Sequence, residues 1–177
     1  MAVARRCGTV QTMQSEPIHP AVRPGHVHLL VADIERSLAF YRDTLGFQLT
    51  ADGYGLGLDM VFLAAGDYHH HVGLNSIWTS GAKPPPPGHT GLYHVAFVYP
   101  DRRELAKAVK RVLDQGYPID HGTDHGATVS VYLDDPDGNG VELYYDRPRT
   151  AWFDEQGRPI VKREQFDYLE LVGELSP

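Results

Sequence analysis

The sequence has 177 residues, of which 42% are hydrophobic and 22% are charged; this composition is ordinary for a globular protein and excludes a disordered chain. The formal net charge of −7 gives no reason to expect a nucleic acid or an acidic membrane as a partner. No apolar run approaches the roughly 18 residues that a membrane span needs. The one cysteine, Cys7, has no partner for an internal disulfide, so we expect a cytoplasmic protein.

The beginning of the chain lacks the apolar stretch of a signal peptide. We expect residues 1–24 to form a flexible arm. Ten histidines are many for this length, and three of them stand together in the stretch GDYHHHVGLN. This clustering raises the question of whether they bind a metal, move protons or form a solvated patch.

The chain contains an internal repeat. The segment HVHLLVADIERSLAFYRDTLGF begins at His26, and HVAFVYPDRRELAKAVKRVLDQGY begins at His94. In each segment an aspartate follows seven residues after the histidine, Asp33 in the first and Asp101 in the second. A self-match that holds at one spacing over several positions predicts a duplicated module.

Each repeat predicts a strand followed by a helix. Asp33 and Asp101 are expected as helix N-caps, and Glu104 adds the pattern of a capping box. Apolar residues recur at helical spacing after both caps: Ile34, Leu38, Tyr41 and Leu45 in the first helix, and Leu105, Val109, Val112 and Leu113 in the second. Gly46 and Gly116 stand where helices commonly end.

Strand-like stretches follow each helix, so each module is predicted as β-α-β-β-β. We predict an α+β protein of two such modules, residues 25–79 and 92–147, joined by the proline-rich linker 80–91 and forming one paired unit over 25–147. DDPDGNG is expected to contain the turn of the last hairpin. Residues 148–177 form an extension that we expect to cover a cavity or to pack on a neighbouring subunit of a homo-oligomer.

Strand alternation assigns the two faces of each sheet. Valine and leucine side chains of the opening strands and of the last hairpin fall on one face, which should pack against the helices. The opposite face carries His26 and His28 in one module, and His94, Tyr132 and Glu142 in the other. We therefore expect these polar side chains to share one concave half-barrel.

His26, His94 and Glu142 form a candidate metal site on that face. A carboxylate in a partly buried cavity is costly unless it is paired or bound to a cation. Two imidazoles and one carboxylate are typical of non-haem Fe(II) centres, and Zn(II) accepts the same ligands. The alternative is that Glu142 contacts an arginine or water and that both histidines are ordinary polar residues.

The motifs HVHLLVADIERSLAFYRDTLGF, YHVAFV and DPDGNGVELYYD resemble the vicinal oxygen chelate superfamily, which includes glyoxalases, bleomycin- and fosfomycin-resistance proteins and extradiol dioxygenases. The resemblance covers about residues 25–150. YHHHVGLN and DHGATVSVYLDDPDGNGVELYYDRPRTAW are similar to extradiol catechol 2,3-dioxygenases. The resemblance implies one vicinal oxygen chelate domain with a metal cavity, and a small aromatic diol and O2 as substrates.

The resemblance implies His26, His94 and Glu142 as ligands of Fe(II), with Mn(II) or Zn(II) as the alternative metals. It also implies three catalytic residues: His70, His121 and Tyr132. Two of these assignments stay open at this point. Alternation would place His69 and His71, not His70, in the cavity unless a strand begins or bulges near position 71, and His125 could replace His121. His28 is either a substrate contact or polar filler.

Other functions of the same superfamily remain alternatives: a glyoxalase-like isomerase or lyase, a thiol transferase, or a resistance or binding protein without catalysis. The glyoxalase centre needs a further acidic ligand on the last strand of the first module. Gly73 occupies that place, which favours the dioxygenase.

Overall fold

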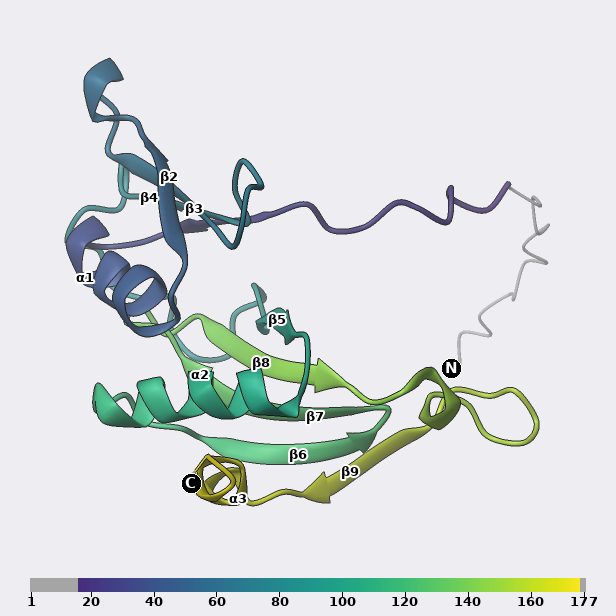
Figure 1. Ribbon diagram of the computed structural model, residues 1–177. Helices are drawn as coiled ribbons and strands as arrows, with labels where there is room; N and C mark the ends of the chain where they lie inside the picture. The colour runs from purple at the N-terminus through teal and green to yellow at the C-terminus, as the bar shows by residue number, and fades with distance from the viewer. Residues whose placement is uncertain (1–15, 176–177) are drawn as a thin grey trace, which may run out of the picture.

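The computed structural model describes residues 16–175, and it contains two separate sheets (Figure 1). Residues 1–15, the larger part of the predicted arm, lie outside the described residues. The predicted α+β class and the two βαβββ modules are confirmed. Among the helices of the described residues, none is long and apolar enough to cross a membrane.

The first module forms a four-stranded sheet in the order β1-β4-β3-β2. The parallel pair β1–β4 places the beginning of the module beside its end. Its elements are β1 (Val27–Leu30), α1 (Ile34–Leu38), a π-helical segment (Ala39–Thr44), β2 (Gln48–Asp52), a 3-10 turn (Tyr54–Leu56), β3 (Met60–Ala64) and β4 (Val72–Asn75).

The second module repeats this topology in a five-stranded sheet, β5-β8-β7-β6-β9, with β5 parallel to β8. The fifth strand comes from the C-terminal extension. The elements are β5 (Val95–Tyr99), α2 (Arg102–Asp114), β6 (His121–Gly126), β7 (Thr128–Asp134), β8 (Gly140–Asp146), a 3-10 turn (Arg149–Ala151), β9 (Val161–Gln165) and α3 (Tyr168–Gly173).

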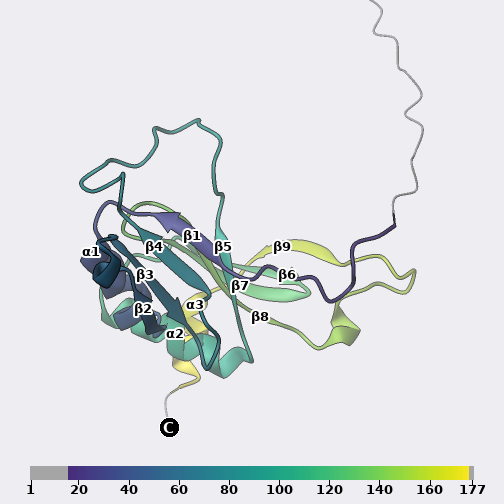
Figure 2. The ribbon, with the colours of Figure 1, turned by 90° about the horizontal axis from the view of Figure 1, so that it is seen from above.

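The two sheets lie apart, joined on the side that carries α1 and α2 (Figures 1 and 2). They are open sheets that do not share strands. The apolar faces and the helices build one common core, in which Phe40 contacts Tyr117 of the other module with their rings 5.0 Å apart. Sequence periodicity identified those apolar faces correctly, but the relation between the sheets depends on contacts between the modules.

Both predicted N-caps are present. The side chain of Asp33 accepts a hydrogen bond from the backbone N–H of Arg36 at 3.0 Å, and that of Asp101 accepts from the N–H of Glu104 at 2.9 Å. Glu104 does not complete a capping box, because its carboxylate pairs with Lys107 at 2.5 Å. Lysine three residues along the helix competes successfully for that carboxylate.

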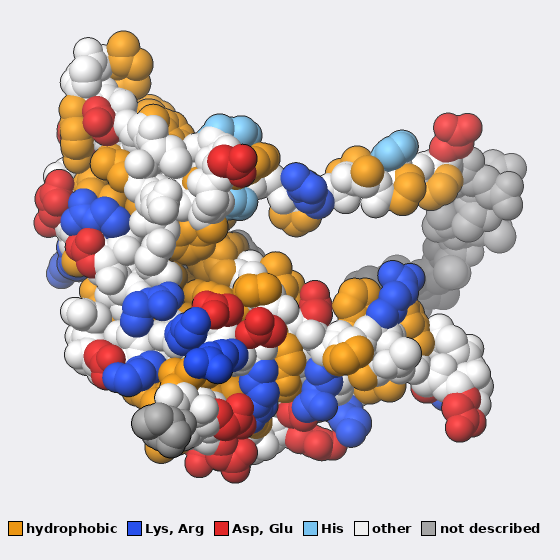
Figure 3. Space-filling view, viewed as in Figure 1, with side chains coloured by type: hydrophobic (Ala, Val, Ile, Leu, Met, Phe, Trp, Pro, Cys, Tyr) orange, Lys and Arg blue, Asp and Glu red, His pale blue; other side chains and the backbone are white. Residues whose placement is uncertain are grey.

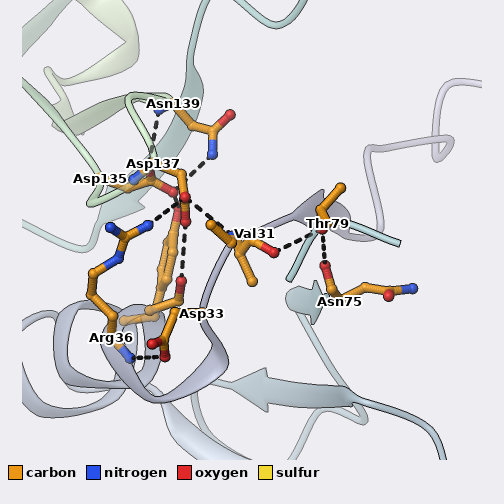
Figure 4. A network of polar contacts seen from close by, with 11 residues as sticks. Val31, Asp33, Arg36, Asn75, Thr79, Asp135, Asp137 and Asn139 are labelled. Atoms are coloured by element: carbon orange, nitrogen blue, oxygen red, sulfur yellow. Dashed lines mark hydrogen bonds and ion pairs between the residues drawn. The ribbon is translucent and has the colours of Figure 1, made fainter. Parts of the chain in front are cut away.

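The turn between β7 and β8 joins the second module to the first (Figure 4). Asp137 accepts hydrogen bonds from the backbone N–H of Ala32 at 3.1 Å and from the guanidinium of Arg36 at 2.5 Å. Asp135, 5% exposed, accepts from the hydroxyl of Tyr41 at 2.9 Å. Burial, followed by the charge of Asp135, raises the pKa of Tyr41 well above its usual value. The hydroxyl therefore stays protonated and remains a donor.

The C-terminal extension completes the second module. β9 pairs with β6, and Leu171 of α3 is fully buried in the common core. Arg102 at the start of α2 binds Glu174 through its guanidinium at 2.6 Å. The extension is therefore held against its own chain over β6 and α2.

Tyr41→Phe tests the junction between the modules. Removing the hydroxyl deprives the buried carboxylate of Asp135 of one donor, so we expect a loss of about 1–3 kcal/mol in the free energy of unfolding. Urea unfolding followed by circular dichroism measures this change. Tyr54→Phe is the matched control, because the Tyr54 ring is half exposed and should change stability by less than about 0.5 kcal/mol. Equal effects of the two substitutions would contradict the role given to the junction.

Candidate functional site

Three side chains of the second module lie side by side on the face that points away from the helices. His121 of β6 is directly opposite Tyr132 of β7, and Tyr132 is directly opposite Glu142 of β8. Directly opposed residues of neighbouring strands project to the same face of a sheet. The register of three strands therefore brings these residues into one row.

Glu142 is the most buried member of this row, at 9% exposed. One of its carboxylate oxygens accepts a hydrogen bond from the Tyr132 hydroxyl at 2.8 Å, and the other lies 3.1 Å from Nε2 of His94. His94 precedes β5, the strand that pairs with β8. These two contacts compensate the buried charge of the carboxylate, whose isolation would be costly.

Tyr132 connects the carboxylate to two further histidines. The His121 ring stacks on the Tyr132 ring with centroids 4.6 Å apart, and Nε2 of His125 lies 2.8 Å from the Tyr132 hydroxyl. Desolvation, followed by the hydrogen bond to Glu142, raises the pKa of Tyr132 to about 12. Both His121 and His125 thus contact Tyr132. They are four residues apart on β6, and this spacing was the reason to consider His125 beside His121 from the sequence.

This set, His94, His121, His125, Tyr132 and Glu142, is called the C-terminal half-site below. Two adjoining hollows, of about 120 and 340 Å³, are each lined by Tyr93, His94, His121 and Tyr132. Lys162 of β9 also lines the larger hollow. The C-terminal half-site is therefore concave and open to a small molecule.

The first module carries a second cluster, His26, His28, Phe62 and His70, called the N-terminal half-site below. The ring of His70 lies 4.4 Å from that of His26 and 4.9 Å from that of Phe62, centroid to centroid. β4 begins only at Val72, so His70 precedes the strand and does not follow its alternation. Because β4 begins after His70, the His70 ring lies beside His26 and not on the apolar side that strand alternation would give it.

Burial, followed by the nearby charges of His26, His69 and His28, lowers the pKa of His70 below its usual value. His69 contacts His70 through their Nδ1 atoms at 2.7 Å. His71 lies elsewhere: its Nδ1 accepts a hydrogen bond from the backbone N–H of Ala65. Of the three consecutive histidines, His70 is the one that packs directly against His26.

His28 lies over Gly73 on the neighbouring strand. A Cβ at Gly73 would come within 3.0 Å of the His28 ring, so the missing side chain makes room for the imidazole. The place where a glyoxalase centre would need an acid is therefore filled by the His28 ring.

The three predicted metal ligands are divided between the two half-sites. His94 and Glu142 lie together with suitable donor atoms, but His26 lies with His70 on the other sheet. Among residues 16–175, no group of three or more His, Cys, Asp and Glu side chains is placed to hold a metal ion. One chain thus does not complete the centre that the sequence predicts, and the ligand set stays a prediction.

A cavity of about 410 Å³ between the modules contains none of these side chains. It is lined by Pro24, Leu45–Phe47, Ala65, His71 and Ala96–Pro100. Its wall is largely apolar, and His71 is the one imidazole among the lining residues.

Residues 23–143 match the model of the Glyoxalase/Bleomycin resistance protein/Dioxygenase superfamily. The chain belongs to this superfamily. A crystal structure of a glyoxalase/dioxygenase from Nostoc punctiforme is 24% identical and has a TM-score of 0.60; the match covers 76% of this chain and 99% of that one. This likeness confirms the fold.

Relatives that carry dioxygenase names are more similar in sequence. The chain is 37% identical to the catechol-2,3-dioxygenase of Bacillus subtilis over 168 residues, 89% of this chain and 53% of that protein. It is 32% identical to biphenyl-2,3-diol 1,2-dioxygenase 3 of Rhodococcus globerulus over 70% of this chain and 63% of that protein. The chain therefore spans between about half and two thirds of the length of these relatives.

Gly140→Ala tests the placement of His94. A Cβ at Gly140 would collide with the carbonyl oxygen of Tyr93 and come within 3.1 Å of the His94 Cβ. We expect a loss of about 1–3 kcal/mol in the free energy of unfolding, together with weaker binding of Co(II), measured by titration of its absorption spectrum. Gly55→Ala is the control, because a Cβ there meets nothing within 4 Å. Unchanged stability and Co(II) binding in Gly140→Ala would contradict this placement.

Proposed function

We propose that the protein is an extradiol-type dioxygenase that opens the ring of a catechol with O2 at an Fe(II) centre. The product would be a ring-opened semialdehyde that contains both oxygen atoms of O2. The proposed ligands are His26, His94 and Glu142. The relatives named as catechol and biphenyl-diol dioxygenases support this reaction class.

The row of His121, Tyr132 and Glu142 is the observation that carries the proposal. It combines a buried carboxylate, a hydroxyl that donates to it and imidazoles beside a concave surface. Such groups bind diol hydroxyls and transfer protons. A catechol bound in the larger hollow would contact Tyr132 and His121 through its two hydroxyls.

Each residue has a distinct role in the proposal. Tyr132 orients the Glu142 carboxylate by donating a hydrogen bond to it, as the neighbours of ligating carboxylates commonly do. His121 and Tyr132 would orient the substrate oxygens. His70 lies beside His26 in the other half-site, so it would accept a proton from a catechol only in a centre that also contains His26. When bound, Fe(II) would supply the site where both reactants are held together.

The glyoxalase alternative is less well supported. β4 carries Val72, Gly73, Leu74 and Asn75, and none of these side chains is acidic. The space beside Gly73 is occupied by the His28 ring. The first module therefore lacks an acidic ligand at the position where that centre would need one.

Metal removal and reconstitution test the reaction. Protein treated with a chelator should take up no oxygen when a catechol is added. Anaerobic reconstitution with Fe(II), followed by catechol and air, should restore oxygen uptake and give a yellow product. An absence of oxygen uptake with a panel of substituted catechols, at full iron occupancy, would refute the dioxygenase.

Tyr132→Phe tests the proposed role of the hydroxyl. Loss of the hydrogen bond to Glu142 should lower kcat/KM for the catechol by about 10–100-fold, the usual effect of removing such a partner. Steady-state oxygen uptake measures this. His89→Ala is the matched control, because His89 is exposed in the linker and contacts the Pro86 carbonyl. A Tyr132→Phe enzyme as active as His89→Ala would remove Tyr132 from the mechanism.

A further inference from the structure

The two hollows of the C-terminal half-site differ in charge. Lys162 and Arg163 of β9 line the larger hollow, and no acidic side chain of the described residues does so. The smaller hollow is lined by Asp120 and Asp134 and by no lysine or arginine of the described residues. Tyr132 lines both hollows. The half-site therefore has a basic side and an acidic side, with the tyrosine between them.

The strand register places Arg163 on the same face as the site histidines. Thr123, two residues after His121 on β6, is directly opposite Gln165 of β9. Directly opposed residues share a face, and residues two apart on a strand do so as well. Arg163 stands two residues before Gln165. The C-terminal extension therefore supplies a guanidinium to the face that carries His121.

A bulge in β9 brings Lys162 to the same place. The register of β6 and β9 shifts after Asp124, so Lys162 and Arg163 together stand opposite the single residue His125. Bulges of this kind redirect side chains beside functional sites. Nδ1 of His125 lies 3.0 Å from the carbonyl oxygen of Lys162, and its Nε2 lies 2.8 Å from the Tyr132 hydroxyl. Because a carbonyl oxygen only accepts, His125 donates from Nδ1 and connects the bulge to the tyrosine.

Both cations are accessible to a ligand. All five residues of β9 are exposed, and Lys and Arg side chains lie over this strand in the surface view (Figure 3). The ammonium of Lys162 is 3.5 Å from the carboxylate of Glu164, and the ion pairs among residues 16–175 do not include Arg163. An exposed pair of this kind contributes little to stability, so a bound anion replaces water or a weak contact here.

We propose that Lys162 and Arg163 bind a carboxylate substituent of the substrate, which is therefore an aromatic diol acid rather than a neutral catechol. A planar guanidinium matches a carboxylate through two parallel hydrogen bonds, and the ammonium adds a second positive charge. The diol end of the molecule rests on the proposed function and lies at Tyr132. The reverse orientation is disfavoured, because it brings the carboxylate toward Asp120 and Asp134.

The relatives do not supply this specificity. The diols in the names of the two relatives, catechol and biphenyl-2,3-diol, carry no charged substituent. The inference depends instead on β9, a strand that the C-terminal extension of this chain adds to the sheet beside the hollow.

Binding of two matched ligands tests this specificity. The acid 3,4-dihydroxybenzoate and its amide, 3,4-dihydroxybenzamide, have the same diol and nearly the same shape, but only the acid is charged. Calorimetric titration of the iron-loaded protein without oxygen measures their dissociation constants without turnover. We expect the acid to bind about 10-fold more tightly than the amide, because each of two exposed ion pairs contributes a few-fold. Added salt should reduce this preference, since exposed charges are screened.

Substitutions on β9 should remove the preference for the acid. The double variant Lys162→Gln/Arg163→Gln should bind the acid and the amide with dissociation constants within about two-fold of each other. Lys110→Gln is the matched control, because it removes one positive charge from α2, where the ammonium pairs with Asp114 at 2.6 Å. This control should keep the preference of the parent. The preference is a ratio of two affinities of one protein, so a general loss of folding does not mimic its removal.

The outcomes separate this inference from the proposed function. A preference for the acid that is lost in the double variant and kept in Lys110→Gln supports the carboxylate site, even if no oxygen is taken up with any catechol. Equal affinities in the parent, binding of neither ligand, a preference that survives in the double variant or an equal loss in Lys110→Gln would overturn it. Cleavage of neutral catechols without any preference for the acid would leave the proposed function standing and remove the carboxylate site.

Discussion

The carboxylates of Asp135 and Asp137 determine how the two halves of this protein are arranged. Both lie in the turn between β7 and β8, yet their partners, Tyr41, Ala32 and Arg36, belong to the first module. A buried acid that loses its donors costs more than the bond itself contributes. The turn therefore holds the modules together through their apolar, helix-bearing sides, and both polar faces remain open.

The site chemistry follows from this arrangement. In the C-terminal half-site, the Glu142 carboxylate accepts a hydrogen bond from Tyr132 at 2.8 Å and lies 3.1 Å from Nε2 of His94, so both of its oxygens have a partner in the second module. In the N-terminal half-site, burial, followed by the charges of the neighbouring imidazoles, lowers the pKa of His70. In the C-terminal half-site, Glu142 contacts His94 and Tyr132, whereas His121 and His125 lie against the ring and the hydroxyl of Tyr132. Among residues 16–175, no group of three or more His, Cys, Asp and Glu side chains is placed to hold a metal ion.

Local periodicity predicted much of the fold and part of the site. Asp33 and Asp101 cap helices as expected, and Tyr132 and Glu142 share a face because the tight turn between β7 and β8 fixes the register. The placement of His70 required knowing where β4 begins, which alternation alone did not give. The arrangement of the two sheets depends on contacts between distant parts of the chain, such as the hydrogen bond from the Ala32 N–H to Asp137. No local sequence pattern encodes such a contact. For the same reason, the sequence did not show that α3 packs on its own chain, where Leu171 is buried in the core.

The central proposal is that the face with His94, Tyr132 and Glu142 binds the iron at which a catechol is opened. Anomalous scattering from iron in crystals of the reconstituted protein locates the ion and its ligands directly. We expect one iron per chain, with the neighbouring side chains of His94 and Glu142 among its ligands. An iron bound away from His94 and Glu142 would contradict the account.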